Sequence, residues 1–472
     1  MTRRRTHVLV TVLVALVGLG LVGLLALRLL SDSVLRQLTD GRLEGADYWT
    51  AEPEILSAGL GFDGIIGLSR LDEETVRDAG GSWYGSLTCS DGSDPTDKNR
   101  TSAATTSTVE SAYEGGGDVD HDDGLPVVFS WPVATETVDP TDFRLTLNTG
   151  ATVSPHAAGM VPNWELDERN TVVLFGDLGN RLPSTDPGAI FPVRLEIVAD
   201  DTPLVLVGPG GREVSAVGLS WTTRTSPYDS GPVLVGAKLN RVGSPPVGEG
   251  GVGLLERSGT MPNDELALYG GGGFRLRVLT SGGFSPDGVT GVRPDEFEDF
   301  FRIRARGPDG RTVLLEHTGV DYRVAGGTLR VVGLADLGRR RDHYDDCYQE
   351  DRDNYIDIVL DGDEAAARSI EAVEIPSSAG GYRAFYNPGG PGPEPFPGVR
   401  YTAPGPPDVQ PVTIALDDPM RVSRDAVAHG PTPRILALAA ALLGVVLLTV
   451  AYARWGWTRV RPGRRPQAPR AG

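Results

Sequence analysis

The sequence VDPTDF at residues 138–143 opens a β-rich stretch, residues 138–198, and a weaker copy of this stretch follows at residues 292–360. The second copy opens with VRPDEF at residues 292–297. Both copies contain the pattern Asp-Leu-Gly-x-Arg, as DLGNR at residues 177–181 and as DLGRR at residues 336–340. We interpret the pair as two copies of one structural unit. Chance similarity between two glycine-rich β stretches is the alternative.

Short runs of β-branched and aromatic residues make up both copies and their surroundings. Examples are residues 127–131, 143–147, 171–175 and 191–198, and then residues 274–280, 301–304, 312–316, 328–332 and 355–360. Such runs at close spacing, separated by Gly, Pro and Asp, are typical of antiparallel β-sandwiches. The sequence therefore predicts a mainly β fold, with a first sandwich at residues 125–241 and a second at residues 272–385.

A family resemblance adds to this prediction. The order VFSWPV at residues 128–133, TVDPTDF at residues 137–143 and NTV at residues 170–172 resembles bacterial Ig-like domains of S-layer and other surface proteins. The resemblance covers residues 127–198 well and the second copy poorly. It implies tandem Ig-like sandwiches that act as spacers or adhesion modules and carry no catalytic residues.

Two apolar runs lie near the ends of the chain. Residues 8–27 contain no charged side chain and follow three arginines, and residues 435–453 contain none and precede six arginines. A membrane-spanning helix needs roughly 20 apolar residues, and short basic flanks remain in the cytoplasm. We expect transmembrane helices at residues 8–30, as an uncleaved signal anchor, and at residues 434–453. A cleaved signal peptide or a buried core helix is the alternative.

This topology leaves cytoplasmic tails at residues 1–7 and 454–472 and an extracytoplasmic domain between the helices. Residues 1–30 and 434–472 carry 11 of the 44 basic residues and no acid, so residues 31–433 have 33 basic against 63 acidic residues. A strongly negative field repels nucleic acid, which argues against nucleic-acid binding. The expected partners are the membrane, through both helices, and cell-surface proteins or glycans.

The remaining segments are expected to connect these parts. Residues 31–89 form an N-terminal extracytoplasmic region, with a helix at residues 64–79. Residues 90–124 have few large apolar side chains to offset the entropy of ordering, which predicts a disordered linker. Residues 242–271 predict a connector, and residues 386–433 a spacer rich in Pro and Gly that ends in a last strand at residues 412–416.

The densest group of carboxylates lies at residues 342–364. Within it, oxygen ligands suited to calcium recur at close spacing in Asp351, Asp353, Asn354 and Asp357. Ile356 stands where an EF-hand loop requires glycine, so the stretch is not an EF-hand. Calcium is the one cofactor that the sequence suggests, and a solvated acidic loop is the alternative.

Cys89 and Cys347 are the only two cysteines. Outside the cytoplasm they could form one disulfide, which would join the N-terminal region to the second sandwich. Two isolated thiols are the alternative.

The sequence contains neither a Gly-x-Ser-x-Gly elbow nor a His or Cys pair at zinc-binding spacing. We therefore expect a membrane-anchored cell-surface protein with a structural or binding role, displaying an acidic β-sandwich ectodomain. One alternative is an extracytoplasmic metal-dependent hydrolase that uses the acidic stretch and His343. The other is a calcium-dependent adhesion protein. No catalytic residue is assigned.

Overall fold

The computed structural model describes residues 41–59, 61–163, 165–180, 182, 184–228, 232–242, 272–284, 289, 291–338, 341–377 and 406–427. All of them belong to one compact unit, Leu38–Val427. Among these residues, no helix has both the length and the apolar character needed to cross a membrane. The predicted spans at residues 8–30 and 434–453, and nearly all of the predicted connector at residues 242–271, lie outside the described residues.

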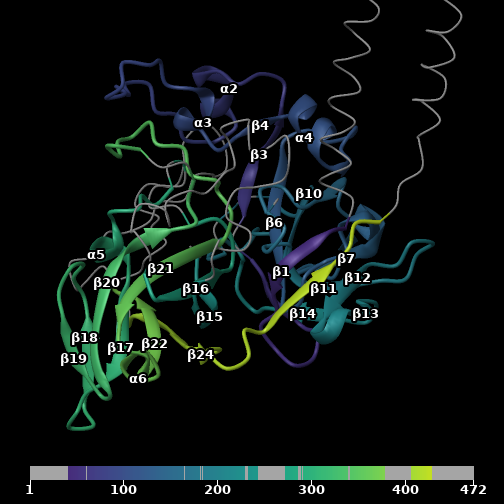
Figure 1. Cartoon of the computed structure of the whole chain (residues 1–472). Coiled ribbons are helices and arrows are strands. Elements are labelled where there is room, and N and C mark those ends of the chain that lie inside the picture. The colour runs from purple at the N-terminus through teal and green to yellow at the C-terminus, as the bar shows by residue number, and fades with distance from the viewer. Residues whose placement is uncertain are drawn as a thin grey trace, which may run out of the picture. The chain divides into compact units, whose positions relative to one another are not determined.

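The fold is mainly β, as the spacing of the apolar runs predicts, and its strands are arranged in two lobes (Figure 1). In the first lobe, the larger sheet follows the order β4 (Ala104–Thr105), β3 (Phe62–Leu68), β6 (Asp122–Phe129), β10 (Thr171–Gly176), β9 (Ala157–Gly159) and β5 (Glu114–Gly115), and β2 (Ile55–Ala58) also pairs with β6. Its smaller sheet follows the order β14 (Ser220–Thr222), β11 (Pro192–Ile197), β7 (Phe143–Leu147) and β8 (Thr152–Val153). A separate hairpin joins β12 (Val205–Gly208) and β13 (Arg212–Ser215).

The second lobe repeats this two-sheet plan. Its larger sheet follows the order β19 (Tyr322–Val324), β20 (Gly327–Ala335), β21 (Tyr355–Gly362), β16 (Phe274–Thr280), β15 (Leu234–Arg241) and β24 (Thr413–Ile414). Its smaller sheet follows the order β18 (Thr312–Leu315), β17 (Arg302–Arg306), β22 (Ile370–Ile375) and β23 (Asp408–Pro411). The short helices α5 (Phe297–Phe300) and α6 (Glu364–Ala367) precede β17 and β22.

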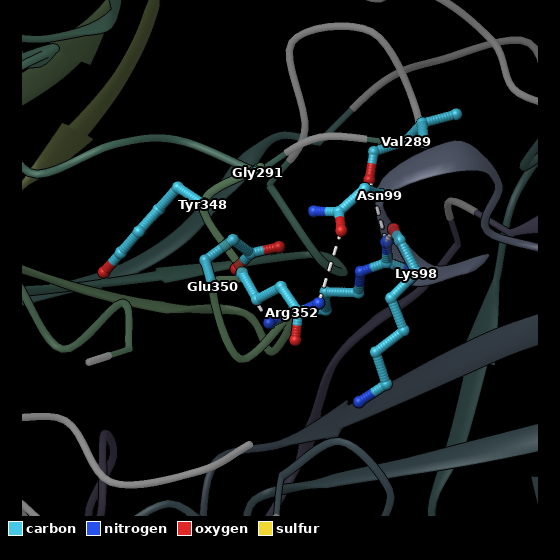
Figure 2. A pocket seen from close by; sticks show the side chains of 8 residues that line it. Lys98, Asn99, Val289, Gly291, Tyr348, Glu350 and Arg352 are labelled. Carbon is cyan, nitrogen blue, oxygen red and sulfur yellow. Dashed lines mark hydrogen bonds between the residues drawn. The ribbon is translucent and has the colours of Figure 1, made fainter. Parts of the chain in front are cut away.

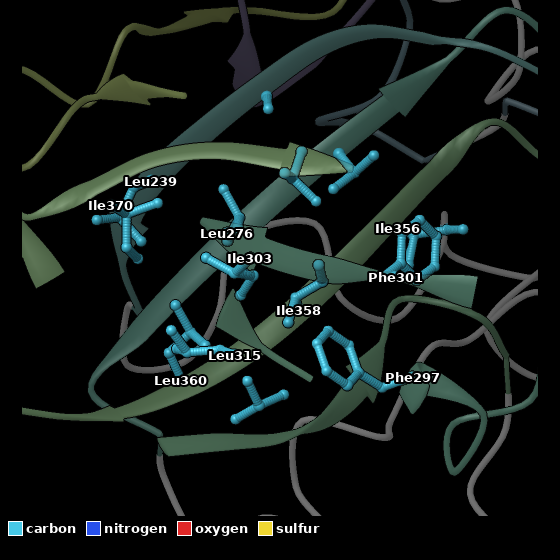
Figure 3. Packing of buried hydrophobic residues seen from close by; sticks show 14 of the residues in the cluster. Leu239, Leu276, Phe297, Phe301, Ile303, Leu315, Ile356, Ile358, Leu360 and Ile370 are labelled. Atoms are coloured by element: carbon cyan, nitrogen blue, oxygen red, sulfur yellow. The ribbon is translucent and has the colours of Figure 1, made fainter. Parts of the chain in front are cut away.

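Each lobe buries its own apolar core between its two sheets. In β7 every second side chain is buried, because successive side chains of a strand point to opposite faces. Leu145 of β7 and Val172 of β10 thereby belong to one cluster in the first lobe. In the second lobe, Leu276, Ile303 and Ile358 come from both sheets and pack together (Figure 3). The two-sheet packing agrees with the predicted sandwich class.

The repeat is visible in the strand pairing. Strand β7 pairs with β8 and β11, and β17 pairs in the same way with β18 and β22. The hairpin partners β9 and β10 correspond to β19 and β20. In the second lobe, however, β21 lies between β20 and β16, whereas β10 pairs directly with β6. The counterpart of β11 is therefore β22, which lies beyond residues 292–360, the predicted bounds of the second copy.

The prediction of a disordered linker at residues 90–124 is wrong. This segment forms α3 (Asp97–Arg100), β4, α4 (Thr106–Ala112), β5 and the first residues of β6. Val109 and Val119 are almost fully buried against Ile65 of β3, and the Thr105 side chain caps α4 by accepting from the Thr108 amide. A few well-placed apolar side chains thus order a segment that is polar on average.

The predicted helix at residues 64–79 is only half correct. Residues 62–68 are strand β3, which pairs with β6, and the helix α2 spans Glu73–Asp78 alone. Asp72 begins this helix by accepting a hydrogen bond from the Thr75 amide. The apolar residues at the start of the predicted helix therefore belong to strand β3, which is paired in the sheet.

The two ends of the described body meet in one antiparallel ladder. Strand β1 (Leu43–Asp47) pairs with β25 (Arg421–Arg424), with Leu43 opposite Arg424. The Arg424 guanidinium also donates to the Gly41 carbonyl at 3.1 Å. Because the strands are antiparallel, the chain enters β1 and leaves β25 at the same end of the ladder.

Candidate functional site

The lobes meet through an interface that is polar at its centre. The Tyr355 hydroxyl of β21 donates to the Asn170 side chain of the first lobe at 2.6 Å. The Asn354 carboxamide oxygen accepts from Asn163 at 2.7 Å and from Thr171 at 3.1 Å. All of these residues are buried. Specific hydrogen bonds therefore join the two sandwiches, which are not independent domains connected only by a linker.

Strand β16 supplies the central cations of this interface. Its residues Phe274, Leu276 and Val278 face the core of the second lobe. Alternate residues of a strand point to opposite faces, so Arg275 and Arg277 point out of that core. Both are nonetheless buried, because the first lobe covers this face of the sheet.

Arg277 is the centre of a buried ionic cluster. Its guanidinium forms a two-pronged pair with Asp357, with nitrogen-to-oxygen distances of 2.9 and 3.1 Å. It also pairs with four further carboxylates, those of Asp47, Asp167, Glu168 and Asp336. A forked, permanently charged guanidinium is the side chain best suited to such multiple pairing.

Asp47 links the paired chain ends to this cluster. It lies on β1, and its carboxylate is 2.5 Å from the Lys238 ammonium and 3.4 Å from the Arg421 guanidinium of β25. Burial alone would raise the pKa of Asp47, but Lys238, Arg277 and Arg275 together hold that pKa below its ordinary value. Asp47 is therefore a carboxylate whose charge the protein fully compensates.

A second part of the cluster consists of carboxyl groups that lie close to one another. Glu165, Asp167 and Glu168 lie between β9 and β10, and one carboxylate oxygen from each falls within 4.8 Å of the others. The Asp353 carboxyl from the second lobe contacts that of Glu168. Four carboxyl groups from two lobes thus converge in the buried interface.

Several of these oxygens receive no hydrogen bond from any donor among the described residues. They include Asp167 Oδ1, both oxygens of Glu168 and Asp353 Oδ2. Asp167 Oδ2 accepts a hydrogen bond from Arg277, and Asp353 Oδ1 accepts one from the Tyr355 amide. Glu168 Oε1 lies 3.2 Å from the Arg277 guanidinium, as an ion pair without a hydrogen bond.

The pKa values reflect this environment. Burial raises the pKa of both Asp167 and Asp353 to about 7, against the pull of Arg277. Burial, with the nearby charge of Asp336, raises the pKa of Glu165 and Glu168 well above the ordinary value. A group of carboxyls with such values needs either protons or a cation to be stable.

The charge balance of the cluster leads to the same conclusion. Its buried acids are Asp47, Glu165, Asp167, Glu168, Asp336, Asp351, Asp353 and Asp357. The cations of the same region are Arg169, Lys238, Arg275, Arg277 and the half-buried Arg421. Among the described residues of this region, carboxyls therefore outnumber cations by eight to five, and buried charge that is not compensated is costly.

The four residues predicted to bind calcium do not converge on one ion. Asn354 uses its carboxamide to join the lobes, and Asp357 is occupied by Arg277. Asp351 contacts Glu350 and accepts from the Asp353 amide. Asp353 contacts Glu168 of the first lobe. All four residues are also buried, so the alternative of a solvated acidic loop does not hold for them.

Glu165, Asp167 and Glu168 were not predicted from the sequence. They belong to the stretch PNWELDERN at residues 162–170, which places three acids within four positions directly before a strand. That spacing could have indicated a group of carboxyls at one site. It was missed because the longer acidic stretch at residues 342–364 dominates the composition of the chain.

The repeated aspartates of the two DLG motifs have different environments. Asp177 is exposed, whereas Asp336 is buried and pairs with Arg277. Asp336 also has a left-handed backbone, with φ of 65°, which is uncommon for a residue with a side chain. The same motif thus leaves its aspartate at the surface in one lobe and places it in the ionic cluster in the other.

Cys89 and Cys347 are joined in a disulfide, with their Cα atoms 5.3 Å apart. The bond fastens the loop at residues 341–353 to the N-terminal region, and the neighbouring Ser90 amide donates to Asp345 at 2.6 Å. Arg352 of the same loop donates to the carbonyl oxygens of Thr101 and Val289. The acidic loop is therefore held from both sides.

A small hollow lies beneath this loop, lined by Lys98, Asn99, Val289, Glu350 and Arg352 (Figure 2). Burial raises the pKa of Glu350 to about 8 and lowers that of Lys98. Asn99 heads the only Asn-Arg-Thr sequon, but its side chain is buried and accepts from the Thr96 amide in a capping box. In the folded protein this asparagine is not accessible for glycosylation.

The hydrolase alternative requires His343 and the acidic stretch to form an accessible site. His343 is exposed, whereas Asp351 and Asp353 are buried. A substrate could reach these carboxylates only if the lobes opened. The described geometry therefore does not present these two carboxylates to a substrate.

No family model matches the chain, and neither the curated proteins nor the solved structures contain a significant match. The function must therefore be inferred from the residues and their geometry.

Proposed function

We propose that the chain is a membrane-anchored cell-surface protein whose two joined β-sandwiches form a rigid acidic body with a structural or binding role. Its partners are the membrane, through the apolar segments at both ends, and other surface proteins or glycans. The Ig-like resemblance of residues 127–198 agrees with such a role.

The pairing of β1 with β25 is the observation that carries this proposal. Since the ladder is antiparallel, Leu43 and Arg424 lie opposite each other. The apolar run at residues 8–27 precedes β1 by a short segment, and the run at residues 435–453 follows β25 by another. Two segments that start from one point can readily enter the same membrane on the same side.

The disulfide supports an extracytoplasmic location. Disulfides persist in oxidising compartments and are rare in the cytosol. This bond joins residues 258 positions apart and lies outside both apolar runs. The arginine clusters beyond the two runs agree with cytoplasmic ends.

The buried interface supports a structural role over a catalytic one. Arg277, Asp47 and Asp357 connect the paired ends to both lobes. A mechanical load applied at the paired ends of the body would reach the ionic cluster through β1, which carries Asp47. Such an arrangement favours a body that moves as one piece.

The test is a topology measurement on intact cells. One epitope is inserted after Gly310, in an exposed turn between β17 and β18, and another is fused after Gly472. The first epitope should be stained on intact cells, and the second only after permeabilisation. Staining of the terminal epitope on intact cells, or recovery of the full chain without detergent, would overturn the proposal.

A further inference from the structure

We propose that Glu165, Asp167, Glu168 and Asp353 bind one calcium ion at the interface between the two lobes. The site draws three ligands from the first lobe and one from the second. All four residues belong to the described body, and the site does not depend on membrane anchoring.

Three carboxyl groups of the first lobe lie close enough together to share one ion. Carboxylate oxygens of Glu165, Asp167 and Glu168 lie within 4.8 Å of one another. Two oxygens bound to one calcium at about 2.4 Å can be separated by at most about twice that distance. The three side chains can therefore share one ion without a change of backbone.

Several oxygens of these side chains are buried without a hydrogen-bond donor in the described part of the chain. Asp167 Oδ1, Glu168 Oε2 and Asp353 Oδ2 receive no hydrogen bond from the described residues, although all three residues are more than nine-tenths buried. Such atoms are rare in folded proteins, because an unmade hydrogen bond in the interior is costly. A cation supplies the missing interaction.

The Glu168 and Asp353 carboxyls touch although both are acceptors when ionised. A divalent cation between them removes this repulsion. Arg277 already pairs with Asp167 Oδ2 and Glu168 Oε1, which are other oxygens than Asp167 Oδ1 and Glu168 Oε2.

The ligand set identifies the class of ion. The three grouped ligands Glu165, Asp167 and Glu168 are carboxylates, without His or Cys among them, and Asp353, which contacts Glu168, is a carboxylate as well. Hard oxygen ligands favour calcium or magnesium over zinc or copper. Magnesium retains several waters and needs near-octahedral geometry, whereas calcium accepts an irregular cage of protein oxygens. A buried cage of four carboxylates therefore fits calcium better.

The ion would have a definite structural effect. Glu165, Asp167 and Glu168 precede β10, and Asp353 precedes β21. An ion bound to all four would tie the first lobe to the second beside the hydrogen bonds of Asn354. Its removal should loosen the interface before it unfolds either sandwich.

The test uses the full chain purified in detergent. Metal content is measured by mass spectrometry after dialysis against calcium, and binding is followed by terbium luminescence with calcium as competitor. We expect one ion per chain, competition by calcium and not by magnesium, and a lower thermal midpoint after treatment with a chelator. Absence of bound calcium, with a thermal midpoint that the chelator leaves unchanged, would overturn the proposal and show that protons alone neutralise the group.

Variants locate the site. Glu168→Gln and Asp353→Asn should each weaken calcium binding by at least tenfold, whereas Glu371→Gln, at an exposed position of β22, should leave it unchanged. Calcium binding of wild-type strength in Glu168→Gln would refute the assignment. If that variant fails to fold, hydrogen exchange of the wild-type chain decides. Chelation must then raise exchange at Tyr355, whose amide Asp353 holds, and equal exchange with and without calcium would refute the site.

Discussion

Replacement of Arg277 by methionine should destabilise the protein more than any loss of a surface ion pair. The change keeps most of the side-chain volume but removes the guanidinium that pairs with Asp47, Asp167 and Asp357 among others. Arg277 is fully buried, so water cannot replace it at these carboxylates. Removing one partner of a buried ion pair costs about 3–5 kcal/mol, and several carboxylates lose their partner here.

The expected shift in melting temperature follows from the size of the body. Leu38–Val427 contains 390 residues. At about 2.1 cal/mol/K per residue, its unfolding entropy is about 0.8 kcal/mol/K. A loss of 3–5 kcal/mol thus lowers the midpoint by about 4–6 °C. Arg277→Lys keeps the charge but not the fork, and it should give a smaller decrease.

The assay is differential scanning calorimetry of the full chain in detergent. The matched control is Arg311→Met, because the Arg311 side chain is 89% exposed and lies 3.7 Å from Asp309. Exposed pairs contribute about 0–1 kcal/mol, so the control should melt within about 1 °C of the wild type. Equal midpoints for the Arg277 and Arg311 variants would refute the idea that the ionic cluster holds the lobes together.

Two further predictions concern the disulfide and the core. Replacing Cys89 and Cys347 by serine should lower the free energy of unfolding by about 5 kcal/mol in the chain-entropy model. Urea titration should show the same midpoint for this variant as for the reduced wild type. A midpoint equal to that of the oxidised wild type would contradict the prediction. Gly208→Ala should cost about 1–3 kcal/mol, because a Cβ at this position would lie 2.2 Å from the Trp131 ring. Gly273→Ala is the control, since a Cβ there meets nothing within 4 Å, and equal urea midpoints for the two alanine variants would argue against the tight contact.

Local pattern was sufficient to predict the strands. The alternation in β7 and the turn residues between runs follow from backbone geometry, which any sandwich must satisfy. The two-copy plan was also readable, because both copies keep the VDPTDF-like start and the DLG motif. The insertion of β21 between β20 and β16 could not be predicted from the sequence, because the partner of a strand depends on contacts between residues far apart in the chain.

The site was the less predictable part. Asp353 was expected to bind a cation, but Glu165, Asp167 and Glu168 come from a segment more than 180 residues earlier. Sequence spacing can bring together only ligands that are close in the chain. The order of residues 90–124 was missed for a similar reason, because Val109 and Val119 become informative only once β3 is known to lie beside them.

The sequence by itself determined that this protein is mainly β, two-fold repeated, acidic between two apolar ends, and able to form one disulfide. These properties depend on residue type, local periodicity and count. Only the tertiary structure decided that Arg277 lies between two lobes, that β1 meets β25, and that four carboxyls converge in the interface. Each of these depends on which faces of distant strands become buried against each other, and burial is what turns an ordinary charged side chain into one that must find a partner.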